Sequence, residues 1–160
     1  MSSCVFPGSF DPLTKGHMDL IIRASRLFDR VTVTMMVNIR KKETIPSDLR
    51  FQMLQHACAD FGNVRIDRWD GLLTDYMRNH GERIIIRGVR SGLEYETEYI
   101  SARINRSMCP ETETLLIPSD PELACVSSSV VRELAQFGGD IRPYVPENVL
   151  EEIRSALSNH

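Results

Sequence analysis

The sequence predicts an α/β fold with a doubly wound parallel sheet of five strands. Short apolar runs alternate along the chain with longer amphipathic stretches of helical period. One run, Ile84-Ile85-Ile86, is uninterrupted, which is typical of strands that are buried on both faces of a parallel sheet. The 160 residues contain no internal repeat and no linker-like stretch, so we expect a single domain over residues 1–160.

Strands are expected where short apolar runs are bounded by turn residues, at residues 4–6, 31–37, 64–66, 83–86 and 114–117. Helices are expected where apolar residues recur at helical spacing, at about residues 17–28, 47–61, 72–80, 92–108, 128–137 and 146–157. Ser47 is expected to cap the second helix, Gly62 to end it, and Pro146 to begin the last one. This alternation predicts right-handed βαβ units, which bind ligands beyond the carboxyl ends of their strands.

Composition and charge exclude several classes of function. With 42% hydrophobic and 26% charged residues and a net charge of −3, the chain has the composition of a globular protein without the basic surface that non-specific nucleic-acid binding requires. No apolar run is long enough to span a bilayer, and the N-terminus lacks the features of a signal peptide, so we expect a cytoplasmic protein without a membrane partner. The four cysteines are widely spaced, which favours reduced thiols and argues against a zinc site.

The first of four polar clusters at predicted strand ends is VFPGSFDPLTKGH, residues 5–17. Gly8 and the flanking prolines predict a sharp exit from the strand, and Ser9 offers a hydroxyl at the turn. His17 stands at the start of a helix, whose free N–H groups attract anions. It could donate Nε2–H to a phosphoryl oxygen in a transition state, or it could be a surface histidine at an ordinary junction.

The second and third clusters are basic. Asn38-Ile39-Arg40-Lys41-Lys42 places three cations at a strand end, either as a solvated loop or as a contact for a phosphate-bearing substrate. IIIRGVR, residues 84–90, runs from a buried strand into two arginines, which suit bidentate phosphate binding. Three glutamates follow at positions 94, 96 and 98. They could neutralise the arginines structurally, or contact a ribose or a metal indirectly.

The fourth cluster is Val126-Ser127-Ser128-Ser129, directly before an amphipathic helix. One serine can cap that helix, and the other hydroxyls could form a second anion site with the helix N–H groups. The chain lacks a Ser-His-Asp order with an elbow motif, H-E-x-x-H and any recognisable pair of carboxylates. We therefore expect neither a covalent intermediate nor a tightly held protein-bound metal.

Together these clusters resemble the signatures of the nucleotidyltransferase superfamily. T-K-G-H (14–17) resembles its H/T-x-G-H motif, and V-S-S-S-x-x-R (126–132) resembles I-S-S-S/T-x-x-R. PGSFDPLTKGH, IIIRGVR and YVPENV (144–149) together resemble the bacterial phosphopantetheine adenylyltransferases over essentially the whole chain. The resemblance implies a Rossmann-like nucleotidyltransferase fold.

The resemblance also implies a reaction and partners. Members of this family join ATP and 4′-phosphopantetheine to give dephospho-coenzyme A and pyrophosphate, with Mg²⁺, in the penultimate step of coenzyme A synthesis. The substrate phosphate is already a nucleophile, so the enzyme mainly aligns two polyanions and neutralises charge at the α-phosphorus. The family pattern further implies a homohexamer and feedback inhibition by coenzyme A.

Site residues are carried over by position in the motifs. The resemblance implies catalytic roles for His17, Lys41 and Arg90, with Lys42 a less secure neighbour of Lys41. Contacts to 4′-phosphopantetheine are implied for Ser9, Lys41, Leu73 and Arg87. Contacts to ATP are implied for Ser9, Phe10, Gly16, His17, Gly88, Val89, Arg90, Glu98, Leu123, Ala124, Cys125, Val126, Ser127, Ser128 and Ser129. No protein ligand to a metal is implied.

The chain departs from the family pattern at three places, and two other functions stay open. Ser9 stands where many members have threonine, Phe6 where tyrosine is frequent, and residues 91–94 differ from the usual segment. One alternative is a related transferase that acts on glycerol phosphate, nicotinamide mononucleotide or flavin mononucleotide. The other is a catalytically silent nucleotide-binding module, which would have no reason to retain all of these charged groups.

Overall fold

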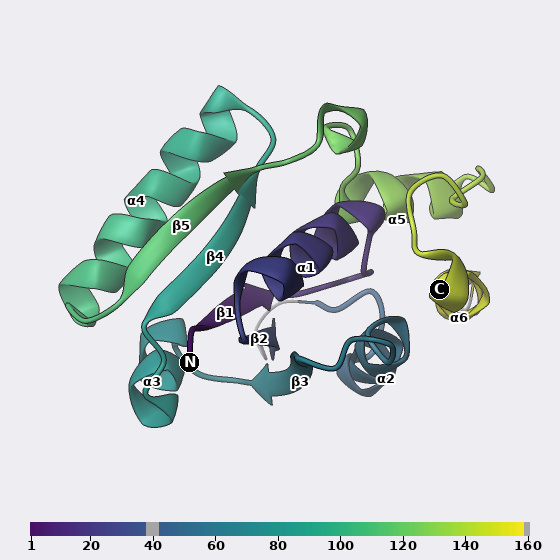
Figure 1. Cartoon of the computed structure of the whole chain (residues 1–160). Coiled ribbons are helices and arrows are strands. Elements are labelled where there is room, and N and C mark those ends of the chain that lie inside the picture. The colour runs from purple at the N-terminus through teal and green to yellow at the C-terminus, as the bar shows by residue number, and fades with distance from the viewer. Residues whose placement is uncertain (38–41, 159–160) are drawn as a thin grey trace.

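The computed structural model describes residues 1–37 and 42–158 (Figure 1). Its strands are β1 (Ser3–Gly8), β2 (Arg30–Met36), β3 (Val64–Trp69), β4 (Ile84–Val89) and β5 (Glu113–Pro118). They form a parallel sheet in the order β3-β2-β1-β4-β5, which confirms the predicted fold class. The strand order reverses between β1 and β4, and sheets of this kind bind ligands at that switch point.

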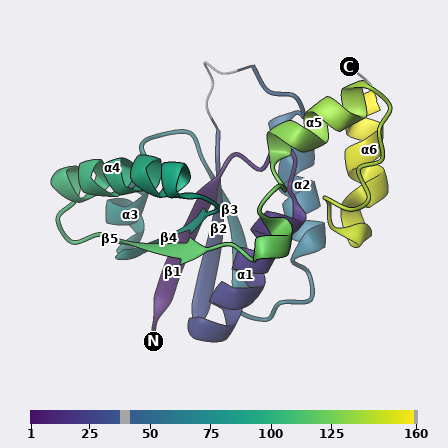
Figure 2. The same cartoon turned by 90° about the horizontal axis from the view of Figure 1, so that it is seen from above.

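Six α-helices in the described part of the chain connect and follow the strands, and Figure 2 shows α1 and α4 on opposite sides of the sheet. They are α1 (Lys15–Leu27), α2 (Ser47–Ala57), α3 (Leu73–His80), α4 (Gly92–Met108), α5 (Ser128–Gln136) and α6 (Leu150–Ser158). Two short 3₁₀ turns, η1 (Pro121–Leu123) and η2 (Glu147–Val149), precede α5 and α6. None of these helices is long and apolar enough to cross a membrane.

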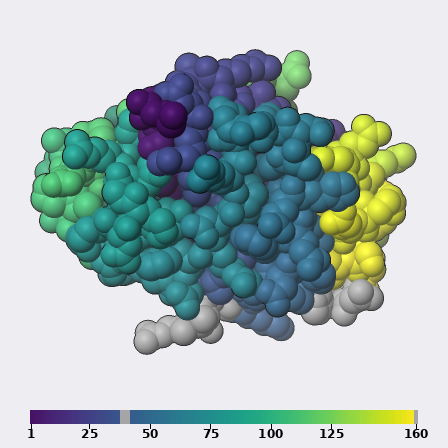
Figure 3. Space-filling view, turned by 60° about the horizontal axis from the view of Figure 1, so that its bottom comes forward, coloured from purple at the N-terminus to yellow at the C-terminus, as the bar shows by residue number. Residues whose placement is uncertain are grey.

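The sheet separates two apolar clusters because successive strand residues point to opposite faces. Phe6 and Ile86 lie in the larger cluster, which also takes residues from α1, α2, α5 and α6. Val5 and Ile85, one residue away on the same strands, pack with Tyr76 and other residues of α3. Burial on both faces explains why the strands carry uninterrupted apolar runs. In Figure 3 the residues of α6, in yellow, form one end of the visible surface.

Three predicted helix boundaries are wrong. Ser47 does not cap α2: it is the first helical residue, and its N–H donates instead to the carboxylate of Glu43 at 3.2 Å. The Glu43 carboxylate thus accepts a free N–H group at the start of α2, which is the part that the side chain of Ser47 was expected to play. The helix also ends at Ala57 rather than near Phe61. Beyond it the N–H groups of Ala59 and Phe61 donate to carbonyl oxygens three residues back, as in turns, and not four residues back, as in an α-helix. Pro146 precedes the 3₁₀ turn η2, so α6 itself begins at Leu150.

Close packing against β4 positions the start of α1. A Cβ atom on Gly88 would lie 2.4 Å from Cδ1 of Leu20, so the absence of a side chain lets the helix approach the strand. The N–H of Lys15, in the first turn of α1, donates to the carbonyl oxygen of Tyr144 at 2.8 Å. The helix N-terminus is therefore held at the switch point from two sides, by β4 and by the segment that precedes α6.

Candidate active site

A cavity of about 530 Å³ opens at the carboxyl ends of β1 and β4, at the switch point of the sheet. Residues from β1, β4, α1, α4 and α5 line it. The predicted site residues among them are Ser9, Gly16, His17, Arg87, Gly88, Arg90, Glu98, Val126, Ser127, Ser128 and Ser129. Three of the four sequence clusters therefore meet in one cavity.

Thr14 fixes the tautomer of His17. The Thr14 hydroxyl accepts the backbone N–H of His17, and the Thr14 backbone N–H donates to Nδ1 of the imidazole at 3.1 Å, which completes a capping box. A backbone N–H can only donate, so Nδ1 carries no proton in this arrangement. The remaining proton of the neutral ring is on Nε2, which leaves that atom as a hydrogen-bond donor.

The surroundings of His17 keep its ring neutral. Phe10 lies edge-on at 5.0 Å between ring centroids and Phe6 at 6.3 Å, and Arg87 and Arg90 line the same cavity. Burial, followed by the charges of the two arginines, lowers the pKa of His17 to about 4. At neutral pH His17 is an uncharged hydrogen-bond donor, which can stabilise charge on a phosphoryl oxygen.

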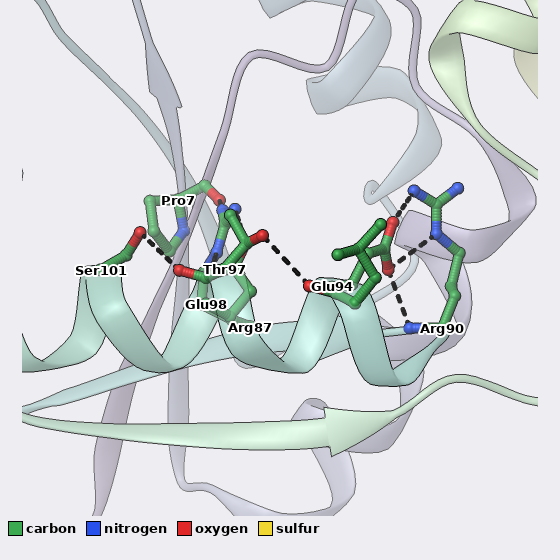
Figure 4. A network of polar contacts seen from close by, with 8 residues as sticks. Pro7, Arg87, Arg90, Glu94, Thr97, Glu98 and Ser101 are labelled. Atoms are coloured by element: carbon green, nitrogen blue, oxygen red, sulfur yellow. Dashed lines mark hydrogen bonds and ion pairs between the residues drawn. The ribbon is translucent and has the colours of Figure 1, made fainter.

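Arg87, on β4, is held by α4 and β1 (Figure 4). Its Nε and Nη2 donate to the two carboxylate oxygens of Glu98 at 2.9 and 2.7 Å, and its Nη1 donates to the carbonyl oxygen of Pro7 at 2.7 Å. A guanidinium has five N–H groups, so three are engaged and two remain for a ligand. The fork is fixed in place before any substrate binds.

Arg90 is held in the same way, by a glutamate that lies one turn earlier on α4 than Glu98 (Figure 4). Its Nε and Nη2 donate to the Glu94 carboxylate, and its Nη1 donates to the carbonyl oxygen of Val126 at 2.8 Å. The hydrogen bonds from Arg90 lower the pKa of Glu94. Each arginine thus pairs with one glutamate, so the charges of these four side chains balance.

The three serines before α5 do three different things. Ser127 caps the helix by accepting the N–H of the residue three positions on, at 3.2 Å. Ser128 donates to the carbonyl oxygen of Pro12 at 2.7 Å, and Ser129 accepts from Nη2 of Arg132 at 3.1 Å. One cap, one tertiary contact to Pro12 and one contact within α5 explain why the motif has more hydroxyls than capping needs.

The turn after β1 is held by Arg132 and by the carboxylate of Asp11, to which sequence analysis gave no role. Phe10 has a φ of 48°, a left-handed conformation that is uncommon for a residue with a side chain, and it is buried. Arg132 donates to the Asp11 carbonyl oxygen at 2.6 Å. The Asp11 carboxylate accepts the N–H groups of residues 44–45, both at 2.9 Å, and so joins this turn to the loop after β2.

Arg50 of α2 also joins the turn after β1 to the loop after β2, and only 3% of its surface is exposed. It donates through Nη1 to the Ser9 carbonyl oxygen at 2.6 Å and through Nε to the Ile45 carbonyl oxygen at 2.8 Å. Its Nη2 forms an ion pair with Glu43. A buried guanidinium satisfied by two carbonyls and a carboxylate is a rigid junction, because removing any partner leaves a charged group unpaired.

Several predicted residues lie outside the cavity lining. Phe10 contacts His17 rather than the open space, and Val89 ends β4 beside the lining residues. Leu73 packs with the apolar cluster between α3 and the sheet. Residues 123–125 lie in and after η1, where the Cys125 thiol is exposed. Lys41 falls outside the described residues, while Lys42 lines a smaller neighbouring cavity of about 80 Å³ together with Ser9.

The cavity has lining residues that sequence analysis did not name as site residues, among them Pro7, Thr14, Leu93, Thr97 and Ser119. Ser119 directly follows β5, so the strand-end rule could have found it. Thr14 precedes His17 by three residues, which is the spacing of a capping box. Thr97 and Leu93 reach the cavity through the orientation of α4, for which the sequence gives no signal.

No group of three or more His, Cys, Asp or Glu side chains suited to a metal ion occurs among the described residues. The carboxylates nearest to the cavity, Glu94 and Glu98, are occupied by arginines. A cation such as Mg²⁺ can instead be held by one or two carboxylates, water and the phosphates of a substrate.

Comparison with known proteins identifies relatives over nearly the full chain. The sequence model of the cytidylyltransferase-like family matches residues 5–134. The phosphopantetheine adenylyltransferase of Rubrobacter xylanophilus is 41% identical over 158 residues, which cover 99% of this chain and 96% of the relative. Those of Heliobacterium modesticaldum and Dictyoglomus thermophilum are 42% and 43% identical, over 94% and 96% of this chain and 89% and 93% of theirs.

A solved structure shares the fold. A crystal structure from Vibrio parahaemolyticus, described provisionally as a nicotinate-nucleotide adenylyltransferase, superposes with a TM-score of 0.69. The alignment covers 98% of this chain and 95% of that one, with 17% sequence identity. At this identity the likeness shows the fold and leaves the acceptor open.

Proposed function

The chain belongs to the phosphopantetheine adenylyltransferase family of cytidylyltransferase-like proteins, and we propose that it transfers the adenylyl group of ATP to 4′-phosphopantetheine. The products are dephospho-coenzyme A and pyrophosphate, in the penultimate step of coenzyme A synthesis. The observation that carries the proposal is the neutral His17 donor in a cavity that also contains two preorganised arginines.

The bond changes are those of an in-line phosphoryl substitution. An oxygen of the phosphopantetheine phosphate attacks the α-phosphorus of ATP, the new phosphoanhydride forms, and the bond to the β-phosphate breaks to release pyrophosphate. Charge increases on the equatorial oxygens of the α-phosphorus as the bonds change. Nε2–H of His17 donates to one of these oxygens, which stabilises the transition state without a covalent intermediate.

The arginines orient the phosphates. We assign Arg90 to the phosphates of ATP, together with the N-terminal N–H groups of α5, and Arg87 to the phosphate of the acceptor. Because Glu94 and Glu98 balance these arginines, the cavity needs further positive charge to bind two polyanions. The resemblance to the family assigns that part to Lys41, with Lys42 next to it in the chain. Leu73 is assigned to the pantetheine arm by the same resemblance.

Mg²⁺ is expected to enter with ATP. The arginine-bound carboxylates leave the cavity short of free protein ligands, so the phosphates and water would supply most of the coordination. When bound, the ion would reduce the negative charge of the triphosphate and make pyrophosphate a better leaving group. A cytoplasmic location, assembly as a homohexamer and feedback inhibition by coenzyme A are expected from the family resemblance.

An acceptor panel tests the proposed reaction. Purified protein with ATP and Mg²⁺ is given 4′-phosphopantetheine, nicotinamide mononucleotide, flavin mononucleotide or glycerol phosphate, and pyrophosphate release is followed. We expect release with 4′-phosphopantetheine alone. Turnover with another acceptor but not with this one would indicate a different transferase, and binding of ATP without any turnover would indicate a silent nucleotide-binding module.

A further inference from the structure

Helix α4 rests on the sheet through a stripe that is mainly polar. None of its 17 residues is buried. The partly covered residues are Glu94, Glu98, Ala102 and Asn105. Its large apolar side chains Ile100, Ile104 and Met108 are instead exposed. A helix that covers a sheet ordinarily presents apolar side chains to it. Two glutamates at these inner positions therefore need another explanation, and each of them holds one arginine of the active site.

Glu98 fixes the plane of the Arg87 guanidinium. Both oxygens of the Glu98 carboxylate accept N–H groups of this arginine, from Nε at 2.9 Å and from Nη2 at 2.7 Å. Two parallel hydrogen bonds hold a carboxylate and a guanidinium in one plane, so the pair has little freedom to rotate. The third contact, from Nη1 to the Pro7 carbonyl oxygen at 2.7 Å, leaves one N–H on each Nη atom without a partner among the described residues.

Glu94 fixes Arg90 and the start of α4 together. One oxygen of its carboxylate accepts the backbone N–H of Arg90 at 2.8 Å and Nε at 3.1 Å, and the other oxygen accepts Nη2. The backbone N–H of Glu94 donates in turn to the hydroxyl of Ser91, which caps the helix, at 3.2 Å. Held in this way, Arg90 reaches the carbonyl oxygen of Val126 at 2.8 Å, immediately before the three serines.

The two arginines are thereby directed to different parts of the cavity. Figure 4 shows the two pairs one after the other along α4, with Pro7 beside the pair that contains Arg87. Pro7 lies two residues before Ser9, in the part of the cavity that the family resemblance assigns to the acceptor. Val126, which Arg90 contacts, adjoins the N-terminus of α5, which we assign to the phosphates of ATP.

We propose that Glu94 and Glu98 are positioning residues, each of which orients one arginine for one substrate. Glu94 directs Arg90 to the phosphates of ATP. Glu98 directs Arg87 to the phosphate of the acceptor. This inference rests on the proposed function and departs from the family resemblance in one respect, because that resemblance implies a contact between Glu98 and ATP. With both carboxylate oxygens bound to Arg87, Glu98 acts on the substrates through this arginine. A carboxylate that faced the triphosphate directly would repel it.

Charge balance and orientation predict opposite effects when a glutamate is lost. If the carboxylates only offset the charge of the arginines, a neutral side chain at either position would make the cavity more positive and strengthen the binding of both substrates. If they orient the arginines, the loss of one carboxylate would free one guanidinium and weaken the binding of one substrate only. A glutamine keeps one acceptor oxygen, but its NH₂ group faces a guanidinium N–H, and two donors cannot pair.

Steady-state kinetics of pyrophosphate release in four glutamate variants and one control tests the proposal. Glu98→Gln should raise the KM for 4′-phosphopantetheine by about tenfold and the KM for ATP by less than about threefold, and Glu94→Gln should do the reverse. Glu98→Asp and Glu94→Asp keep the charge but withdraw the carboxylate by one methylene, so they should show the same crossed pattern with smaller changes. Glu96→Gln, at an exposed position between the two, is the matched control and should leave both KM values unchanged.

Two kinetic outcomes would overturn the positioning roles. Unchanged or lower KM values in the glutamine variants would show that the carboxylates only balance charge. Equal rises in both KM values would indicate a general loss of structure. Where thermal unfolding shows that a glutamine variant does not fold, the aspartate variant at the same position decides between these outcomes.

Calorimetric titration with ATP separates this proposal from the proposed reaction, because it requires no turnover. Glu94→Gln should bind ATP about tenfold more weakly than the wild type, whereas Glu98→Gln should bind it equally well. An equal loss of ATP affinity in both variants would overturn the positioning roles even in a protein that transfers nothing. The same crossed pattern with a different acceptor would leave these roles standing and refute only the proposed acceptor.

Discussion

His17 acts as a donor because of two local features, a hydrogen bond on Nδ1 and an apolar setting. The Thr14 N–H determines which nitrogen carries the proton, while burial and the nearby arginines keep the ring uncharged. The T-x-x-H spacing is visible in the sequence, but the lowered pKa depends on burial of the ring and on the charges of Arg87 and Arg90, which the fold brings to it.

Removing the imidazole should affect turnover more than binding. We expect His17→Ala to lower kcat by about 10²-fold or more and to change the Kd for ATP by a few-fold at most, because the donor acts on charge that develops in the transition state. Steady-state kinetics and calorimetric ATP titration measure the two quantities. Loss of ATP affinity with unchanged kcat would show that His17 is a ground-state contact instead.

The lowered pKa of His17 also makes folding stability depend on pH. Between pH 6.5 and about 4 the unfolded chain binds a proton that the folded chain does not, so the free energy of unfolding falls as the pH falls through this window. The loss attributable to His17 amounts to roughly 3 kcal/mol at pH 4. Urea unfolding of the wild type and of His17→Gln should show a shallower acid dependence in the variant. Equal pH dependence would contradict the neutral state of the half-buried ring.

At the scale of secondary-structure elements, the site depends on contacts that tie three strand-end segments together. Arg50 ties the loop after β2 to the Ser9 turn, and Arg132 of α5 holds the neighbouring Asp11 carbonyl. Sequence analysis located these elements but did not find Arg50, because a single arginine on a helix gives no sign of which distant carbonyls it will meet. It also expected Ser47 to be a cap, although Glu43 takes that part.

Replacing Arg50 should loosen the described segment around residues 43–45, which follows the lysines that the family resemblance assigns to the substrate. We expect Arg50→Ala to raise the KM for 4′-phosphopantetheine by about tenfold, with a smaller effect on the KM for ATP, because the Ser9 turn and the loop after β2 lose a common anchor. Arg50→Lys should recover part of the affinity, since an ammonium can reach one carbonyl or Glu43 but not all three. Equal changes in both KM values, with no rescue by lysine, would indicate general destabilisation.

The serine motif permits a paired test of capping. Ser127→Ala should lower the free energy of unfolding by about 1 kcal/mol, because an N-cap hydrogen bond is lost from α5. Ser129→Ala, two positions on, removes an exposed contact to Arg132 and should change stability by less than about 0.5 kcal/mol. Denaturant unfolding of both variants checks the difference, and the reverse ranking would contradict the assignment of the cap.

For the whole molecule, the sequence was sufficient for the element order and for the edge of the sheet at which the site lies. Apolar runs and helical periods determine those features, and they are local properties of the chain. The sequence left open whether the glutamates at positions 94, 96 and 98 neutralise the arginines or contact a ribose or a metal, and the structure pairs Glu94 and Glu98 with the arginines. It could not show that α4 turns its apolar side outward, because periodicity reveals that a helix has two sides and not which one meets the sheet.

The most direct test of the whole account is to identify the product. Wild-type protein, ATP, Mg²⁺ and 4′-phosphopantetheine should yield dephospho-coenzyme A by mass spectrometry, in an amount equal to the pyrophosphate released. His17→Ala should lower both products together by about 10²-fold. Pyrophosphate released without dephospho-coenzyme A would contradict the central claim, as would a His17→Ala variant that forms dephospho-coenzyme A at the wild-type rate.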